Sequence, residues 1–299
     1  MRNLLKWLVL LLIIILAVLI WKDAPQDAIS ITIALIIAAV SGVFLVQAPH
    51  DDLFSAVSKH DADIDEIQDL IKAGASLTAQ DKDGDTALMK AAARGNSIEI
   101  LSFLIDSGSD LEARDNEGNT PLIHAAMFNP DTGILNALIK SGANVNAKND
   151  AGNTPLITAV MFSQNPEIVS MLINNGADIK AKNMEGLTAL HRASKPDYVA
   201  MLIASGADIN ATDIYGHTPL MTAAFQDDPD TLSAILNSGA DVNAKDREGK
   251  TALMYATEKS RAENVKLLLS YGADTSIRNI DGKTALDLAH GESMKRLLA

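Results

Sequence analysis

The motif Gly-x-Thr-[Ala/Pro]-Leu recurs seven times along this 299-residue chain, at successive steps of 34, 34, 34, 30, 33 and 33 residues. A second motif consists of two aliphatic residues, then any two residues, then glycine, and it recurs with the same six steps. A period in this range is typical of a solenoid, in which one supersecondary unit is stacked many times. The glycines of the first motif are Gly84, Gly118, Gly152, Gly186, Gly216, Gly249 and Gly282.

Each unit begins with Asp or Asn, then a hairpin tip that contains the glycine, and then a threonine. The threonine hydroxyl is suited to cap a helix, and proline follows it in several units, as in Thr120-Pro121. Small residues after the motif predict a first helix that packs closely against its neighbours. A second helix is predicted to begin at an Asx-Pro pair, namely near Asn129-Pro130, Asn165-Pro166 and Asp228-Pro229.

The second helix has an apolar face at helical spacing and ends at the second glycine of the unit, which predicts a left-handed C-cap. This face is read from Ile100, Leu101, Leu104 and Ile105 in one unit and from Ile168, Val169, Leu172 and Ile173 in another. The closing glycines are Gly74, Gly108, Gly142, Gly176, Gly206, Gly239 and Gly272.

A hairpin, a helix, a turn and a second helix at this period resemble the ankyrin repeat. The string Asp-x-x-Gly-x-Thr-Pro-Leu and the run 239–244, Gly-Ala-Asp-Val-Asn-Ala, carry the resemblance. It covers about residues 51–299 and implies an all-α ankyrin-repeat solenoid with β-hairpin tips. The family's histidine after Thr-Pro-Leu is present here only at His191.

The repeat domain is predicted to cover residues 50–299. Residues 51–80 have the pattern of a second helix without a preceding tip motif, and they are interpreted as an N-terminal cap. The seven tip motifs follow in residues 81–299. The last repeat is truncated and polar, as the end of a solenoid needs to be.

A membrane segment is predicted over residues 1–48, with two transmembrane helices at about 4–21 and 28–46. Both stretches are apolar and long enough to cross a bilayer, so residues 4–46 would contact membrane lipid. Arg2, Lys6 and Lys59 lie on one side of this helical hairpin, and Lys22 alone lies in its loop. The excess of basic residues predicts that the N-terminus and the repeat domain face the cytoplasm at the plasma (inner) membrane.

Two alternatives for this segment stay open. Residues 1–24 could be a cleaved signal peptide, although no small-x-small cleavage site is present. Failure of one span to insert would export the repeat domain, for example to the periplasm. The excess of basic residues on the side of the N-terminus and the repeat domain favours the cytoplasmic orientation.

Composition excludes several classes of function. The chain after residue 50 carries 22 Lys and Arg against 36 Asp and Glu, which argues against nucleic acid as a partner. There are no cysteines, and the six histidines lack the spacing of metal ligands, so no metal or cofactor is expected. No nucleophile or phosphate-binding motif occurs, and the chain is therefore not expected to be an enzyme.

Two neighbouring tips are apolar where the others are polar, and they predict a site for a protein partner. These tips flank the one shortened repeat, at 186–216, where Ser194-Lys195-Pro196-Asp197 replaces a longer first helix. Side-by-side apolar residues suggest a contact patch, but mutual packing of the same side chains is an equally open interpretation. The patch comprises Met184, Leu187, Ile214, Tyr215 and His217.

A secondary partner surface is suggested by aromatic residues and methionines just after the paired small residues of the first helices. Repeats usually bury such side chains between stacked helices, and burial is the favoured interpretation. The residues concerned are Met127, Phe128, Met161, Phe162 and Phe225.

The sequence as a whole predicts a membrane-anchored scaffold for protein–protein interaction that presents its hairpin tips and concave face to a cytoplasmic partner. Two alternatives are an exported or host-directed ankyrin binding protein and an accessory subunit of a membrane transport complex. The two spans carry no charge within the membrane and offer no ion path of their own, so the last alternative needs further subunits.

Overall fold

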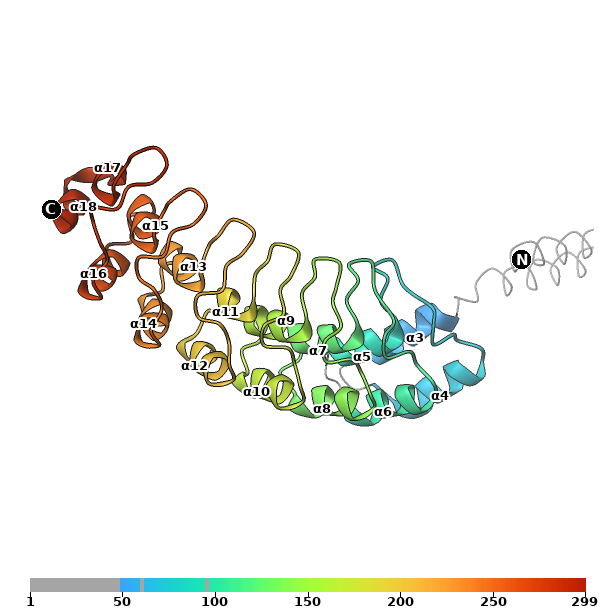
Figure 1. The fold of residues 1–299 in the computed structure, drawn as a ribbon. Coiled ribbons are helices and arrows are strands. Elements are labelled where there is room, and N and C mark those ends of the chain that lie inside the picture. Colours follow the sequence, from blue (N-terminus) through green and yellow to red (C-terminus); the bar gives the residue numbers. More distant parts are fainter. Residues whose placement is uncertain (1–48, 60–61, 95–96) are drawn as a thin grey trace, which may run out of the picture.

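The computed structural model describes residues 49–59, 62–94 and 97–299, and in these residues sixteen helices form eight successive pairs. Figure 1 shows the pairs as a continuous, curved row, with the hairpin loops projecting on one side, next to the first helix of each pair. The first helices are α3 (Pro49–Ser58), α5 (Ala87–Arg94), α7 (Pro121–Phe128), α9 (Pro155–Phe162), α11 (Ala189–Arg192), α13 (Pro219–Phe225), α15 (Ala252–Glu258) and α17 (Ala285–Leu288). The second helices are α4 (Ile64–Lys72), α6 (Ile98–Asp106), α8 (Thr132–Lys140), α10 (Pro166–Asn174), α12 (Pro196–Ala204), α14 (Pro229–Asn237), α16 (Ala262–Ser270) and α18 (Gly291–Leu298).

The predicted spans at 4–21 and 28–46 lie outside the described residues. Among the helices of residues 49–299 that the structure describes, none is long and apolar enough to cross a bilayer. This finding concerns the repeat domain alone.

Each hairpin tip is organised by the Asp or Asn at its base. In the tip of α9's unit, the side-chain oxygen of Asn149 accepts a hydrogen bond from the backbone N–H of Asn153 at 2.9 Å. Asp81, Asp115, Asn183, Asp213, Asp246 and Asn279 accept from the backbone in the same way. These bonds give the turn its shape without strand pairing, because the described residues contain no strand. The expected β-hairpins are therefore turns closed by these side-chain bonds and by backbone bonds, such as that from the N–H of Asn149 to the carbonyl of Asn153 at 3.1 Å.

Neighbouring tips are joined by a ladder of backbone hydrogen bonds. The N–H of Ile214 donates to the carbonyl of Glu185 at 3.0 Å, and the N–H of Met184 donates to that of Ala151 at 3.0 Å. Four more bonds of the same kind join the remaining consecutive tips. The tips thus form one connected edge of the solenoid, which fixes the spacing between side chains of adjacent units.

The two glycines of a unit serve different needs. At the tip, Gly186 has a φ of +77°, and a Cβ there would lie 2.9 Å from the backbone nitrogen of Ile214 in the next tip. At the end of the second helix, Gly206 has a φ of +94°, but a Cβ would meet nothing within 4 Å. The closing glycine is thus required by its backbone conformation, whereas the tip glycine is also required by the close approach of the ladder.

The helix starts follow the predicted caps with one exception. The hydroxyls of Thr120 and Thr154 cap α7 and α9, each followed by proline at the first helical position. Asn165 and Asp228 cap α10 and α14 as expected. The prediction at Asn129-Pro130 was wrong, because α8 is capped by Asp131 and begins at Thr132.

Asn129 has a structural role of its own. This buried residue ends α7, and its amide donates to the carbonyl of Ala92 in the preceding unit at 2.8 Å. Its side-chain oxygen accepts from the N–H of Asp131 at 2.9 Å. Asn129 therefore joins two units and positions the cap of α8, and this dual use shifts the start of the helix by two residues.

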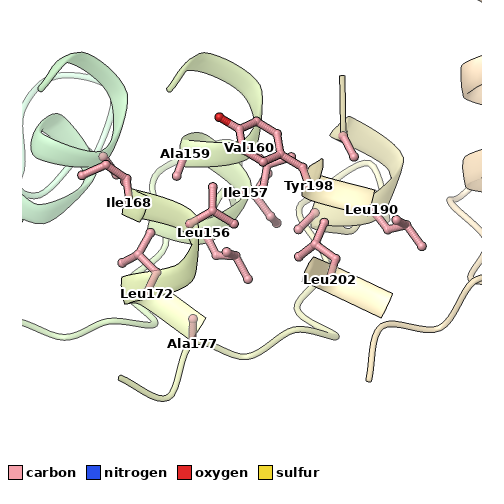
Figure 2. Close-up of a cluster of buried hydrophobic side chains, with 14 of the residues drawn as sticks. Leu156, Ile157, Ala159, Val160, Ile168, Leu172, Ala177, Leu190, Tyr198 and Leu202 are labelled. Carbon is pink, nitrogen blue, oxygen red and sulfur yellow. The ribbon is translucent and has the colours of Figure 1, made fainter. Parts of the chain in front are cut away.

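The core runs without interruption along the array. It is formed by the predicted faces of the second helices and the small residues of the first helices, with Ile105 and Ile173 only half-buried. Figure 2 shows the part around α9, α10 and α12, where Leu156, Leu172 and Leu202 lie between the helices. Burial of this apolar surface is the main force that holds the units together.

The shortened repeat keeps the stack continuous. Its first helix, α11, has only four residues, yet it contacts both α9 and α13. Tyr198 of α12 is fully buried, and its hydroxyl donates to the carbonyl of Ser163 in the preceding unit at 2.7 Å. This buried aromatic side chain thus joins the shortened repeat to the unit before it.

The two ends of the array also form helix pairs. At the N-terminal end α3 and α4 form a pair, and the sequence before them contains no tip motif. At the other end α17 has four residues and α18 is amphipathic, with Met294 and Leu298 buried and its other residues largely exposed. The exposed side of α18 agrees with the expected polar end.

Candidate functional site: the concave face

The concave face is built where the hairpin tips meet the first helices. In three units, a donor on the first helix contacts the aspartate nine residues earlier at the base of the tip. Lys90 lies 2.7 Å from Asp81, Nε2 of His124 lies 2.8 Å from Asp115, and Tyr255 donates to Asp246 at 2.6 Å. Where the tip begins with asparagine, the corresponding helix residues are Thr158, Arg192 and Leu288. The aspartates of these three tips are thus matched by donors on the helix, whereas the fourth, Asp213, contacts His217 of its own tip.

The most connected group lies between the last complete units. Nδ1 of His217 is 3.0 Å from Oδ2 of Asp213, and Nε2 of His217 is 2.9 Å from the hydroxyl of Tyr255. The carboxylates of Asp213 and Asp246 are almost completely buried. Burial raises the pKa of Tyr255, and its hydrogen bond to Asp246 raises it further. Tyr255 is therefore a neutral hydrogen-bond donor at physiological pH.

Two hollows lie on either side of this group and share His217 and Tyr255 in their walls. One has a volume of about 380 Å³ and is also lined by Tyr215, Arg247 and Glu248. The other has a volume of about 330 Å³ and extends to Phe225 and Arg192. Together they form a groove with exposed aromatic rings at both ends.

The predicted patch on the two apolar tips is formed in part. Met184 is 73% exposed, and Ile214 and Tyr215 are also exposed. The tip ladder places Ile214 next to the residue that follows Met184, so these three side chains lie on adjacent tips. The half-buried His217 belongs to the network with Asp213 and Tyr255 instead.

Leu187 is a correction to the predicted patch, because only 8% of this residue is exposed. It occupies the position after the tip glycine, which in other units faces the neighbouring tip. Asn119 and Asn153 stand at this position, and each accepts a hydrogen bond from the asparagine at the base of the next tip, at 2.9 Å. Leu187 is buried in the same column of side chains and packs between the hairpins.

The residues of the secondary surface differ in exposure. Phe128 is 59% exposed, and Phe162 and Phe225 are exposed as well, although burial was the favoured expectation. Met127 and Met161 are half-buried. Each phenylalanine is the last residue of its first helix, beyond the small residues that contact adjacent helices. The concave face therefore carries three exposed rings, which fits the surface interpretation better than burial.

A third hollow, of about 320 Å³, lies between the tips of the second and third units and is lined in part by His124, Met127 and Phe128. At its base Asp85, Asp115 and His124 hold three potential ligand atoms within 4.8 Å of one another. Sequence spacing did not predict this group, since its members come from two hairpins and a helix. Burial opposes the charge of Asp115, but hydrogen bonds from Asn119 and His124 outweigh it and lower the pKa of the carboxyl.

The fold and this face define a class: an all-helical solenoid with a concave recognition surface. A family description, ankyrin repeats in three copies, matches residues 53–149, 127–213, 196–279 and 220–299. The chain belongs to the ankyrin repeat family.

Comparison with solved structures gives the same result. The chain is similar to the crystal structure of the ankyrin repeat domain of Bcl-3, described as a unique member of the IkappaB protein family. The sequences are 30% identical, the TM-score is 0.61, and the match covers 73% of this chain and 99% of that domain. No curated protein matches the chain. Membership of the ankyrin family implies a scaffold for protein–protein interaction.

Proposed function

We propose that the protein is a membrane-tethered, non-catalytic interaction scaffold whose concave face binds a cytoplasmic partner. The tether is the pair of apolar stretches at 4–21 and 28–46, which lie outside the described residues. Their length and the excess of basic residues around them support insertion with the repeat domain on the cytoplasmic side.

The observation that carries the binding proposal is the exposure of Met184, Ile214 and Tyr215 on adjacent tips. The equivalent positions to Met184 and Ile214 in the other units are Lys82, Asn116, Asp150, Arg247 and Ile280, and all but the last are polar. Exposed apolar side chains held at fixed spacing by backbone hydrogen bonds are suited to a preformed interface. The groove beyond them, with Tyr255 in its wall, continues the same surface.

The partner surface is tested by site-specific photo-cross-linking in intact cells. A photoreactive residue at Ile214 is expected to give a discrete cross-linked product, because this position lies in the interface. The same residue at Asp150, the equivalent position of an acidic tip, is the matched control. Equal products from both positions, or none from Ile214, would contradict the proposed surface.

The tether is tested separately. The full-length chain is expected to stay in the membrane fraction after extraction at high pH and to need detergent for release. A reporter fused after Ala299 distinguishes the cytoplasmic from the exported or periplasmic orientation. Release without detergent would rule out the tether, and reporter activity outside the cytoplasm would favour the exported binding protein.

A further inference from the structure

The negative charge of the repeat domain is concentrated in its N-terminal half. Residues 51–184 carry 20 Asp and Glu against 10 Lys and Arg, whereas residues 185–299 carry 16 against 12. The apolar tips and the groove around Tyr255 belong to the second, nearly balanced half. The two halves of the concave face therefore differ in the kind of ligand that they attract.

An apolar shelf lies on the acidic half. Phe128 and Phe162 end the neighbouring helices α7 and α9, which pack against each other, and both rings are exposed. Phe128 and the half-buried Met127 also line the hollow between the tips of the second and third units. An exposed aromatic ring beside a hollow is a typical anchor position in a protein interface.

The side chains around this shelf are acidic. The hollow is lined by Asp83, Asp85, Asp115 and Glu117, and none of its lining residues in the described structure is Lys or Arg. Asp85 and Asp115 contact Lys90 and His124. The two rim carboxylates are much less engaged: Asp83 lies 4.0 Å from the exposed Lys82, and Glu117 accepts only from the amide of Asn119, at 3.3 Å.

We propose that the shelf formed by Phe128, Phe162 and Met127 docks an extended basic segment of a protein partner. An arginine or lysine of that segment lies with its methylene stem on the ring of Phe128, and its charged end reaches the carboxylates of Asp83 and Glu117. A cation beside an aromatic face and a carboxylate gains from both. The apolar neighbours of that basic residue contact Met127 and Phe162.

A divalent cation fits this hollow less well than a basic side chain. The ligand atoms of Asp85, Asp115 and His124 already contact one another or a donor, and the ammonium of Lys90 lies 3.3 Å from Asp85. A bound metal ion would have to displace these contacts against the charge of Lys90. The free carboxylates and the exposed ring lie at the rim, where a peptide has access.

The test uses the full-length chain in detergent and a fluorescent octapeptide of alternating arginine and leucine as the probe. Phe128→Ser and the pair Asp83→Asn with Glu117→Gln are each expected to weaken binding about 5-fold, as loss of a cation–π contact or of two ion pairs implies. The controls make similar changes in the balanced half, away from the groove around Tyr255: Ile280→Ser, and Asp281→Asn with Glu292→Gln. These controls are expected to change the dissociation constant less than about 2-fold.

Equal losses of peptide affinity in the test and control variants would mean that the peptide is attracted by the overall negative charge and not by a defined site, and this result would overturn the proposal. A peptide of alternating glutamate and leucine that binds as well would also overturn it. Saturable Zn²⁺ binding that is lost in His124→Gln, with no binding of the basic peptide, would identify a metal site instead. Thermal melts of each variant separate loss of binding from loss of folding, and Phe162→Ser provides a second apolar change on the same shelf.

Discussion

The hydroxyl of Tyr255 donates a hydrogen bond of 2.6 Å to Asp246, and the same oxygen lies 2.9 Å from Nε2 of His217 in the preceding unit. One side chain on α15 thus satisfies a buried carboxylate of its own hairpin and contacts the hairpin before it. The ring of His217 packs edge-on against that of Tyr255, with their centroids 5.4 Å apart. This contact couples the stability of two units to the shape of the groove between them.

Tyr255→Phe removes both hydrogen bonds and leaves Oδ2 of the buried carboxylate of Asp246 without the tyrosine donor, while Oδ1 keeps its backbone bonds. We expect the free energy of unfolding to fall by about 1–3 kcal/mol, the cost of an unsatisfied buried polar group. Urea denaturation followed by circular dichroism measures this change. Tyr271→Phe is the control, because its hydroxyl bonds to Asn237 on the exposed surface and its loss is expected to cost about 0.5 kcal/mol. An equal loss of unfolding free energy in the two variants would show that the buried network stabilises the fold no more than an exposed hydrogen bond does.

Alanine substitution at the two kinds of glycine is expected to differ. Gly206→Ala places a Cβ in open space at positive φ, which costs about 1–2 kcal/mol. Gly186→Ala has the same backbone cost and also forces the next tip away from its 2.9 Å approach, so the bond from Ile214 to Glu185 is lost. We expect it to cost about 1 kcal/mol more than Gly206→Ala, as measured by denaturant midpoints. A smaller effect at Gly186 would contradict the role given to the tip ladder.

Stability is expected to depend on pH through His191. Burial lowers the pKa of this histidine, although its hydrogen bond to the carbonyl of His217 opposes the shift. A folded-state pKa below the unfolded value means that the unfolded chain binds more protons, so stability is present above about pH 6.5 and is lost as the pH falls. The slope for one such group is at most about 1.4 kcal/mol per pH unit.

The matched variant for this prediction is His191→Met. Methionine occupies the same position in three other units, and in two of them the sulfur of Met89 or Met221 accepts from the N–H of the capping threonine. We expect the variant to fold and to lose part of the decline in melting temperature between pH 7.5 and pH 5. An unchanged pH dependence would show that His191 is not its source.

Lys90→Met tests the match between tip aspartates and helix donors. The Lys90 ammonium pairs with Asp81 at 2.7 Å and with Asp85 at 3.3 Å, and all three side chains are largely buried. Burial opposes its charge, but the two carboxylates outweigh it and raise the pKa of Lys90. Loss of the amine is expected to cost about 1–3 kcal/mol in denaturant unfolding. Lys72→Met, in an exposed pair with Asp69, is expected to cost under about 0.5 kcal/mol.

The repeat period predicted most of the architecture. The capping threonines, the asparagines and aspartates at the base of each tip, and the glycines at positive φ act locally, within four or five residues. Local chemistry of this kind is visible in a sequence, and its sevenfold repetition made the ankyrin resemblance secure. The start of α8 was wrong because Asn129 bonds to Ala92, a contact 37 residues away.

The candidate site was predicted less well than the fold. The sequence identified Met184, Ile214 and Tyr215 as unusual tip residues, and the structure exposes all three. It misplaced Leu187, because hydrophobicity alone does not tell which tip side chains face the next tip. For the phenylalanines it favoured burial over the partner surface that it also suggested, because it does not tell which end of a short helix a neighbour covers. The acidic hollow at Phe128 was missed, since it joins residues from two tips and a helix.

The sequence by itself determined the unit and its repetition, because turns, caps and apolar faces depend on residues close together in the chain. The tertiary structure decided which surfaces are left open, since that depends on how each unit packs against the next. The pairing of Tyr255 with His217 and the exposure of Phe128 arise only once consecutive units are stacked. The proposed recognition surface lies at these contacts between units.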